Sequence, residues 1–157
     1  MIGAEQIFSA SHFLIFSILV KENAMNQEII AANLAAVQVH FDAEKAGDWE
    51  KIKTMYTEDI IWERTRTNQI VKGKEAVALA YVEVFSALKN WDFQCLDRFA
   101  TEDRVVDESI FTFQVKKDGI MPLPVGTRAK LTLVHIFKMS DGRVSRELVM
   151  ESPPQPF

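Results

Sequence analysis

The chain has 157 residues, of which 48% are apolar and 25% charged, with a formal net charge of −4. This length predicts one domain with a sizeable core, and the composition is that of an ordinary globular protein. The negative charge gives no reason to expect nucleic acid or an anionic membrane as a partner. The single cysteine, Cys95, excludes a disulfide framework and a cysteine metal site within this sequence, which fits a reducing, cytoplasmic location.

The N-terminal segment, residues 1–26, differs from the rest of the chain. Residues 7–20 are mostly apolar, but this run is shorter than the roughly 20 residues that cross a bilayer. It also lacks the basic start of a signal peptide. Because Met25 begins what reads as a normal start, residues 1–24 are interpreted as an upstream extension or a misassigned start. If they are translated, we expect a short helix that packs on the domain or on a second subunit.

Three helices are predicted before most of the strands, from apolar residues that recur at helical spacing. They cover residues 26–46, 49–56 and 74–88. Asn26 and Asp48 are suitable N-caps for the first two helices. Gly47 is suited to end the first one, because a left-handed residue commonly follows a helix.

The strand candidates come mainly in the second half of the chain. They cover residues 59–64, 70–71, 92–101, 104–117, 129–139 and 143–151. The pairs Asp118–Gly119 and Asp141–Gly142 are hairpin-turn signals. The prolines after residue 152 are expected to end regular structure. Helices followed by antiparallel strands predict an α+β fold, with the helices on one face of a curved sheet.

His135 lies in the middle of the apolar row of the strand at residues 129–139. Alternate side chains of a strand share a face, and here the row also holds Leu131, Leu133, Phe137 and Met139. The histidine is either a core residue whose ring nitrogens are satisfied by neighbours or a polar group placed inside an apolar cavity.

Both faces of the predicted sheet carry apolar residues. On one face, alternation groups Asp107 and Ser109 with Phe111, and it places Glu147 beside Val149. The opposite face carries Val134, Ile136, Leu148 and Met150. A solvated face would not carry these four side chains, so we expect a homodimer in which a second subunit covers it.

Four motifs resemble the nuclear-transport-factor-two-like superfamily, and in particular its SnoaL-like branch. They are Ala-Gly-Asp-Trp at 46–49, Thr-Glu-Asp-Ile-Ile-Trp at 57–62, Val-Lys-Gly-Lys-Glu-Ala at 71–76 and Ser-Asp-Gly-Arg-Val at 140–144. The resemblance covers residues 27–151 and leaves 152–157 as a tail. It implies a cone-shaped barrel, in which a curved, mainly antiparallel sheet is wrapped by three N-terminal helices around a pocket.

The resemblance also implies which side chains look into that pocket. The expected catalytic residues are Glu147, His135, Asp107 and His40. The expected substrate-binding residues are Trp62, Arg64, Tyr81, Phe85, Ser109, Phe111 and Phe137. This superfamily includes polyketide cyclases, ketosteroid isomerase, scytalone dehydratase and limonene-epoxide hydrolase, so the fold alone does not select a reaction.

The sequence departs from the patterns of two of these activities. Where the isomerase pattern has a catalytic aspartate on the first strand, this chain has Arg64. The isomerase oxyanion-hole positions fall near His40 and His135. Where the epoxide-hydrolase pattern has Arg-x-Asp, this chain has Ser-Ile-Phe at 109–111, and only Glu147 keeps a carboxylate. Neither activity is therefore transferred to this chain. Among the groups considered, the SnoaL-like cyclases are the one that the sequence contradicts least.

Each candidate residue also has a structural interpretation. Glu147 or Asp107 can act as a general base, or can pair with Arg64 or His135 in a buried network. Arg64 can hold an anionic group of a substrate, or can simply neutralise Glu147. His135 and His40 can donate hydrogen bonds to a developing enolate, or can be core histidines. No ligands have metal-binding spacing, so neither a metal nor a cofactor is expected.

Three functions are compatible with these patterns. The first is a cofactor-independent cyclase, isomerase or dehydratase that acts on a small apolar carbonyl compound by general acid–base chemistry. The second is a non-catalytic protein that binds a small molecule in the same pocket. The third is an interaction or dimerisation module whose pocket is closed by Phe111, Phe137 and Met139.

Overall fold

The computed structural model describes residues 10–157 as three α-helices and one seven-stranded sheet. The helices are α1 (Ala10–Ala46), α2 (Trp49–Met55) and α3 (Lys74–Ser86), and a 3-10 turn, η1, covers Thr65–Thr67. The strands are β1 (Tyr56–Arg64), β2 (Gln69–Lys72), β3 (Leu88–Ala100), β4 (Arg104–Val115), β5 (Arg128–Ser140), β6 (Arg143–Glu151) and β7 (Gln155–Pro156).

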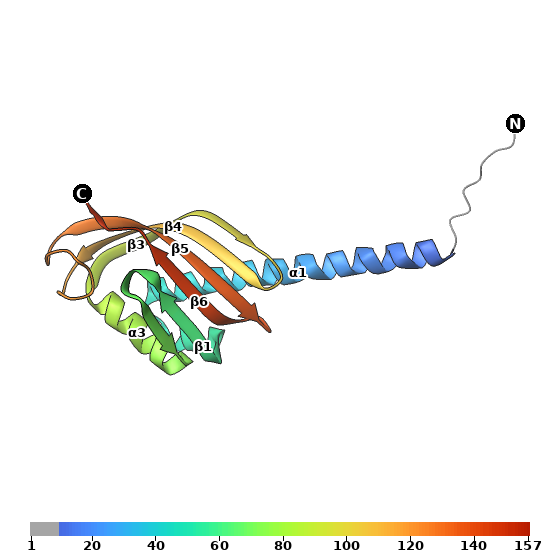
Figure 1. Cartoon of the computed structure of the whole chain (residues 1–157), viewed down its shortest axis with the longest axis horizontal. Helices are drawn as coiled ribbons and strands as arrows, with labels where there is room; N and C mark the ends of the chain where they lie inside the picture. The colour runs from blue at the N-terminus through green and yellow to red at the C-terminus, as the bar shows by residue number, and fades with distance from the viewer. Residues whose placement is uncertain (1–9) are drawn as a thin grey trace, which may run out of the picture.

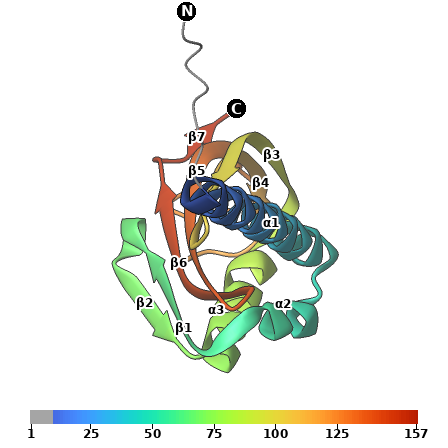
Figure 2. The same ribbon diagram turned by 90° about the vertical axis from the view of Figure 1, so that its right-hand side faces the viewer.

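The sheet is curved and open, and the helices lie on its concave side (Figures 1 and 2). Its strand order is β2-β1-β6-β5-β4-β3, with β7 beside β5. All neighbours are antiparallel except β1 and β6, which are parallel. The predicted α+β cone is confirmed, and the sheet does not close on itself.

The turn between β5 and β6 was correctly predicted. Asp141 and Gly142 both have positive φ angles, 49° and 72°, which suits a tight hairpin between twisted strands. One irregularity follows. Lys138 pairs with Arg146, whereas the next residue, Met139, pairs with Val144, so β6 holds one extra residue. Val144 is therefore buried, although strict alternation assigned it to the outer face.

Other expectations differ from the structure at the ends of elements. Helix α1 already includes Ala10, so Asn26 lies inside a helix and caps nothing. Residues 10–24 continue α1 and do not form a separate short helix, while residues 1–9 lie outside the described part. The Asp118–Gly119 pair belongs to a long loop, and the chain after residue 152 still forms β7.

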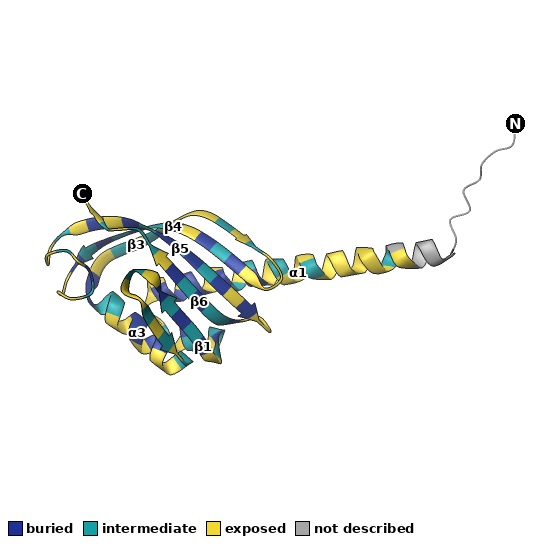
Figure 3. Ribbon diagram, in the orientation of Figure 1, coloured by how far each residue is buried: buried dark blue, intermediate teal, exposed yellow. Residues whose placement is uncertain are grey.

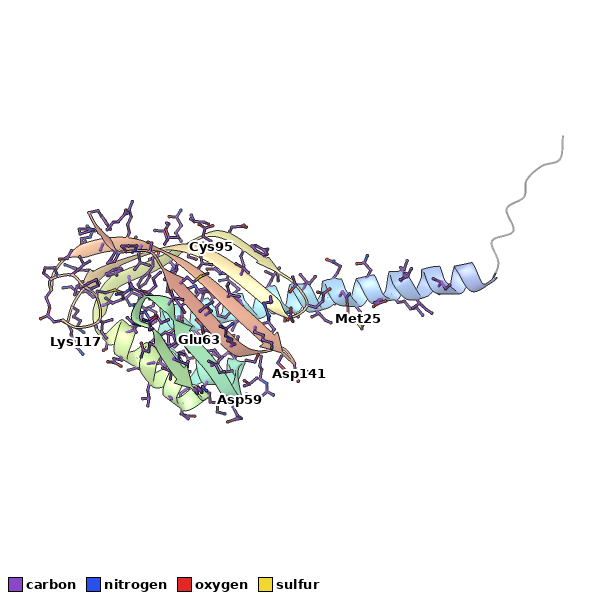
Figure 4. The ribbon with its side chains drawn as sticks, in the orientation of Figure 1. Met25, Asp59, Glu63, Cys95, Lys117 and Asp141 are labelled. Carbon is purple, nitrogen blue, oxygen red and sulfur yellow. The ribbon has the colours of Figure 1, made fainter. Side chains whose placement is uncertain are left out.

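The N-terminal part of α1 projects beyond the sheet, and Met25 lies on this projection (Figures 1, 3 and 4). Helix α1 is fastened to the domain at Asn33, whose side-chain amide donates to the carbonyls of Thr101 and Glu102 at 3.2 and 3.0 Å. The projection exposes large apolar side chains, namely Ile15, Ile18, Leu19, Val20, Met25 and Ile29. No described helix has both the length and the apolar composition needed to cross a membrane.

The C-terminal half of α1 packs on the concave face of the sheet through one buried side of the helix. Val37, His40, Phe41 and Glu44 recur at helical spacing and are buried. Gly47 (φ 66°) then ends the helix, and the Asp48 carboxylate accepts from the Lys51 amide at 3.0 Å to begin α2.

The outer face of the sheet carries a row of four apolar residues, one from each of four neighbouring strands. Pairing places Phe99 beside Val106, Val106 beside Ile136, and Ile136 beside Leu148. Phe99 is exposed and the other three are half-buried. The prediction that a second copy covers this face stays a prediction.

If a second copy covers the row, static light scattering at micromolar concentration should give twice the 17.9 kDa of one chain. Ile136→Lys should then give monomers, because it places a charge at the centre of the buried face. Lys130→Glu, on the same strand and face but outside the row, should leave the dimer intact. A wild-type monomer would remove the argument.

Candidate functional site

The inner face of the sheet is organised in cross-strand rows. One row runs from Trp62 through Glu147 and Phe137 to Val105. The next runs from Arg64 through Val149, His135 and Asp107 to Arg98. A third holds Glu151, Leu133, Ser109 and Cys95. Neighbouring strands lie about 4.8 Å apart, so each row brings side chains distant in sequence close together.

A cavity with about 460 Å³ of empty space, including its opening, lies between these rows and the helices. Its apolar lining includes Val84, Phe85, Phe93, Phe111, Leu131 and Leu133. Its polar lining is Glu44, Trp62, Arg64, Tyr81, His135 and Glu151. An apolar cavity with a few converging polar groups is the usual form of a small-molecule site.

Below the cavity, Glu147 is completely buried and held by two tyrosines. Its two carboxylate oxygens accept hydrogen bonds from Tyr81, at 2.5 Å, and from Tyr56, at 3.1 Å. Burial, together with the nearby charge of Glu147, raises the pKa of both phenols well above the usual value of 10. The tyrosines therefore act as hydroxyl donors, and Tyr81 links Glu147 to the cavity wall.

His40 and Glu44 lie one helical turn apart on the buried face of α1. The Nε2 atom of His40 is 3.3 Å from an oxygen of Glu44, and both side chains are buried. Desolvation lowers the pKa of His40, but the charges of Glu44 and Glu147 outweigh it and the pKa lies above 6.5. The two carboxylates thus favour the protonated form of His40, and Glu44 is the member of the pair that lines the cavity.

Asp107 belongs to a separate network. One carboxylate oxygen accepts from the Ser109 hydroxyl at 2.5 Å, and the other accepts from Nε of Arg98 at 2.8 Å. Arg98 also donates to the Gln38 side chain at 2.8 Å and lies over the Phe41 ring. Ser109 and Arg98 border a second hollow and do not line the cavity described above. Asp107 is thus a buried anion with its own cation.

Arg64 pairs with Glu151 and not with Glu147, which was one of the alternatives considered from the sequence. Nε of Arg64 and Nε of Arg66 each donate to one oxygen of Glu151. Arg66 also donates to the Ile120 carbonyl at 3.3 Å. We call these three side chains, Arg64, Arg66 and Glu151, the arginine pair and its glutamate. Arg64 and Glu151 line the cavity.

Three cavity residues hold buried polar atoms that no described residue supplies with a hydrogen-bond partner. These atoms are Nε1 of Trp62, Nδ1 of His135 and Oε2 of Glu44. They come from β1, β5 and α1, and all three side chains line the same cavity. Leaving a buried polar atom without a partner costs about 1–3 kcal/mol, so such atoms call for an explanation.

The structure brings some of the predicted site residues together and separates others. Trp62, Arg64, Tyr81, Phe85, Phe111 and His135 line the cavity. Glu147, His40 and Phe137 are buried behind its wall, with His40 packed edge-on against Phe137 at 5.3 Å. Asp107 and Ser109 lie in the Arg98 network. The functional role of each residue stays a prediction.

Sequence reasoning missed several members of the site. Glu44 follows His40 by four residues, a spacing that places both on one helix face. Glu151 shares the predicted face of Glu147, although it was not proposed as a site residue. Met121 lines the cavity from the irregular loop between β4 and β5, where no periodic signal exists.

In the described part of the chain, no group of three or more His, Cys, Asp or Glu side chains is placed to hold a metal ion. His40 and Glu44 form a pair, and His135 sits in the neighbouring row beside Val149 and Asp107.

The family follows from a sequence comparison. The family model for the SnoaL-like domain matches residues 37–147, which is most of the chain. The chain belongs to the SnoaL-like domain family. The match contains the cavity residues from α1, β1, α3, β3, β4 and β5, and it ends at Glu147. No curated protein matches the sequence significantly.

Solved structures share the fold of this SnoaL-like domain at low sequence identity. A Jannaschia sp. CCS1 protein, assigned by name to the SnoaL-like polyketide cyclases, gives a TM-score of 0.72 at 18% identity and covers 79% of this chain and 88% of its own. A Kribbella flavida protein, assigned by name to the ketosteroid isomerases, gives 0.63 at 16%, covering 82% of each chain. An LEH-like epoxide hydrolase from M. tuberculosis gives 0.64 at 13%, covering 78% and 84%.

The raised pKa of His40 predicts a stability that depends on pH. A raised pKa in the folded state contributes stability fully below the unfolded pKa of about 6.5, and this contribution is lost as pH rises through the folded pKa. We therefore expect the free energy of unfolding in urea to fall across that window. His40→Gln should flatten this part of the profile, and Glu44→Gln should weaken it. An unchanged slope in His40→Gln would contradict the ion pair.

Proposed function

We propose that this SnoaL-like domain is a cofactor-independent enzyme of the cyclase, isomerase or dehydratase type, acting on a small, largely apolar carbonyl compound. The observation that carries the proposal is that Trp62, His135 and Glu44, which line one apolar cavity, each hold a buried polar atom without a partner among the described residues. A donor, a titratable ring nitrogen and a carboxylate oxygen are the groups that proton abstraction beside a carbonyl requires.

In the proposed reaction Glu44, not Glu147, is the general base. Both oxygens of Glu147 already accept hydrogen bonds, and this side chain lies behind Tyr81. Glu44 has one oxygen without a partner and lines the cavity. Its carboxylate would take a proton from the carbon next to the substrate carbonyl. The electron pair of that C–H bond would move to the carbonyl oxygen as an enolate.

Trp62 and His135 are proposed to stabilise that enolate. The indole N–H of Trp62 can only donate, and the His135 ring donates from Nδ1 when that atom carries the proton. Fixed donors in a dry cavity stabilise developing charge more strongly than water does. In an isomerisation, the proton on Glu44 would then return to a different carbon. In a cyclisation, the enolate carbon would form a bond to a second carbonyl carbon of the substrate, the π electrons of that carbonyl would move to its oxygen, and this oxygen would take the proton from Glu44.

His40 and Tyr81 are proposed to position the reacting groups. Nε2 of His40 lies 3.3 Å from the other oxygen of Glu44, and Tyr81 is fixed by Glu147 and stacks against Trp49 and Phe85. The names of the structural neighbours include a cyclase, an isomerase and an epoxide hydrolase, which agrees with a pocket enzyme and does not select among these reactions.

Proton abstraction can be measured without knowing the natural substrate. The full chain would be incubated in D₂O with 1-indanone or 4-phenyl-2-butanone, and loss of the α-proton signals would be followed by proton NMR. We expect exchange above the buffer rate, and a loss of about 100-fold or more in Glu44→Gln, the typical contribution of a general base.

The matched variants separate the candidate bases. Asp107→Asn should exchange close to the wild-type rate, and Glu147→Gln should lose less than Glu44→Gln. Full exchange by Glu44→Gln would disprove the assignment of the base. Ketones that raise the melting temperature but show no exchange with the wild type would instead support the non-catalytic binding protein.

A further inference from the structure

The arginine pair and its glutamate leave one positive charge beside the cavity. Arg64 and Arg66 carry two positive charges, and Glu151 carries the one carboxylate that both guanidinium groups contact. The Arg64 and Glu151 side chains are 5% and 4% exposed, and that of Arg66 is 19% exposed. Buried charges are normally compensated, because removing an ion from water is costly.

The carboxylate nearest to Arg64 in sequence, that of Glu63, does not supply the missing charge. Glu63, next to Arg64 in sequence, points to the other face of β1 and accepts two hydrogen bonds from Arg146 at 2.9 Å. Within the described residues, the side-chain hydrogen bonds of Arg64 go to Glu151 alone, through Nε. The two terminal amino groups of Arg64 therefore remain available, and Arg64 lines the cavity.

We propose that Arg64 and Arg66 bind an anionic group, most simply a carboxylate, on the substrate. A planar guanidinium matches a carboxylate with two parallel hydrogen bonds, and such charge-assisted bonds are stronger than neutral ones. The proposal uses the cavity of the proposed function but does not depend on catalysis. It narrows the ligand class from an apolar carbonyl compound to a keto acid with an apolar body.

The cross-strand register constrains where the anion lies relative to the carbonyl. Arg64, Val149 and His135 occupy one row on three neighbouring strands, so Arg64 and His135 are about two strand spacings, or roughly 10 Å, apart at the backbone. The Arg64 guanidinium is drawn toward Glu151, which belongs to the next row. The carboxylate and the ketone of the ligand are thus separated by intervening carbons, as in a γ-keto acid.

The test compares 4-oxo-4-phenylbutanoate with its neutral primary amide by isothermal titration calorimetry on the full chain, at constant ionic strength. The wild type should bind the acid at least about tenfold more tightly than the amide. Arg64→Gln should remove this preference. Glu151→Gln should increase it, because it deletes the competing carboxylate. Arg146→Gln, an arginine on the outer face, should leave the preference unchanged.

The opposite signs of two variants separate ligand binding from a structural role. If the three side chains only stabilise the fold, Arg64→Gln and Glu151→Gln will both lower the melting temperature, and neither will change the acid-to-amide ratio. That result would overturn the proposal. The proposal would also be overturned if the wild type bound the two compounds equally, or if it did not bind the acid.

The result of this binding test does not depend on whether the protein catalyses a reaction. A preference for the acid without proton exchange in D₂O would support the anion site and contradict the enzyme. Proton exchange on neutral ketones, without a preference for the acid, would support the enzyme and contradict the anion site.

Discussion

The fold depends on a partner for each buried carboxylate, inside a half-barrel whose interior is otherwise apolar. Glu147, Glu44, Asp107 and the Glu151 side chain are all withdrawn from water, and an unpaired charge there would be strongly destabilising. Each carboxylate is partnered differently: Glu147 by two phenols, Glu44 by an imidazole, Asp107 by one guanidinium and Glu151 by two. The partners come from α1, β1, α3, β3 and η1, so the charges also fix how these elements dock on the sheet.

This arrangement divides the interior into a structural part and an accessible part. The Glu147 and Asp107 networks are satisfied within the protein and lie outside the cavity wall. The residues that line the cavity include those whose polar groups are left incomplete, namely Glu44, Trp62 and His135, together with Arg64, which shares an excess positive charge with Arg66. A ligand that pairs with the unpartnered polar atoms and with the excess positive charge would carry a carbonyl group and an anionic group on an apolar frame.

Alternation and turn signals predicted the sheet well, because both are local. The inner row of β5 around His135, the hairpin at Asp141 and the helix boundary at Gly47 follow from short-range geometry. Partner choice is not local. Nothing in the sequence shows that Arg64 pairs with Glu151 and not with Glu147, because Val149, the residue opposite Arg64, lies two residues from each glutamate. Glu44 was recoverable from its spacing to His40, whereas the cavity contribution of Met121 was not.

We propose that the apolar cavity is the site of function. The most direct test is a thermal-shift screen of the full chain and of Met121→Trp, which places a larger side chain at the cavity wall from a loop. The screen would use aromatic polyketides, terpenoids, steroids and small keto acids. We expect at least one class to raise the melting temperature of the wild type, because binding to the native state alone stabilises it, and the shift should disappear in the variant. A shift that persists in Met121→Trp, or no shift with any class, would contradict the claim.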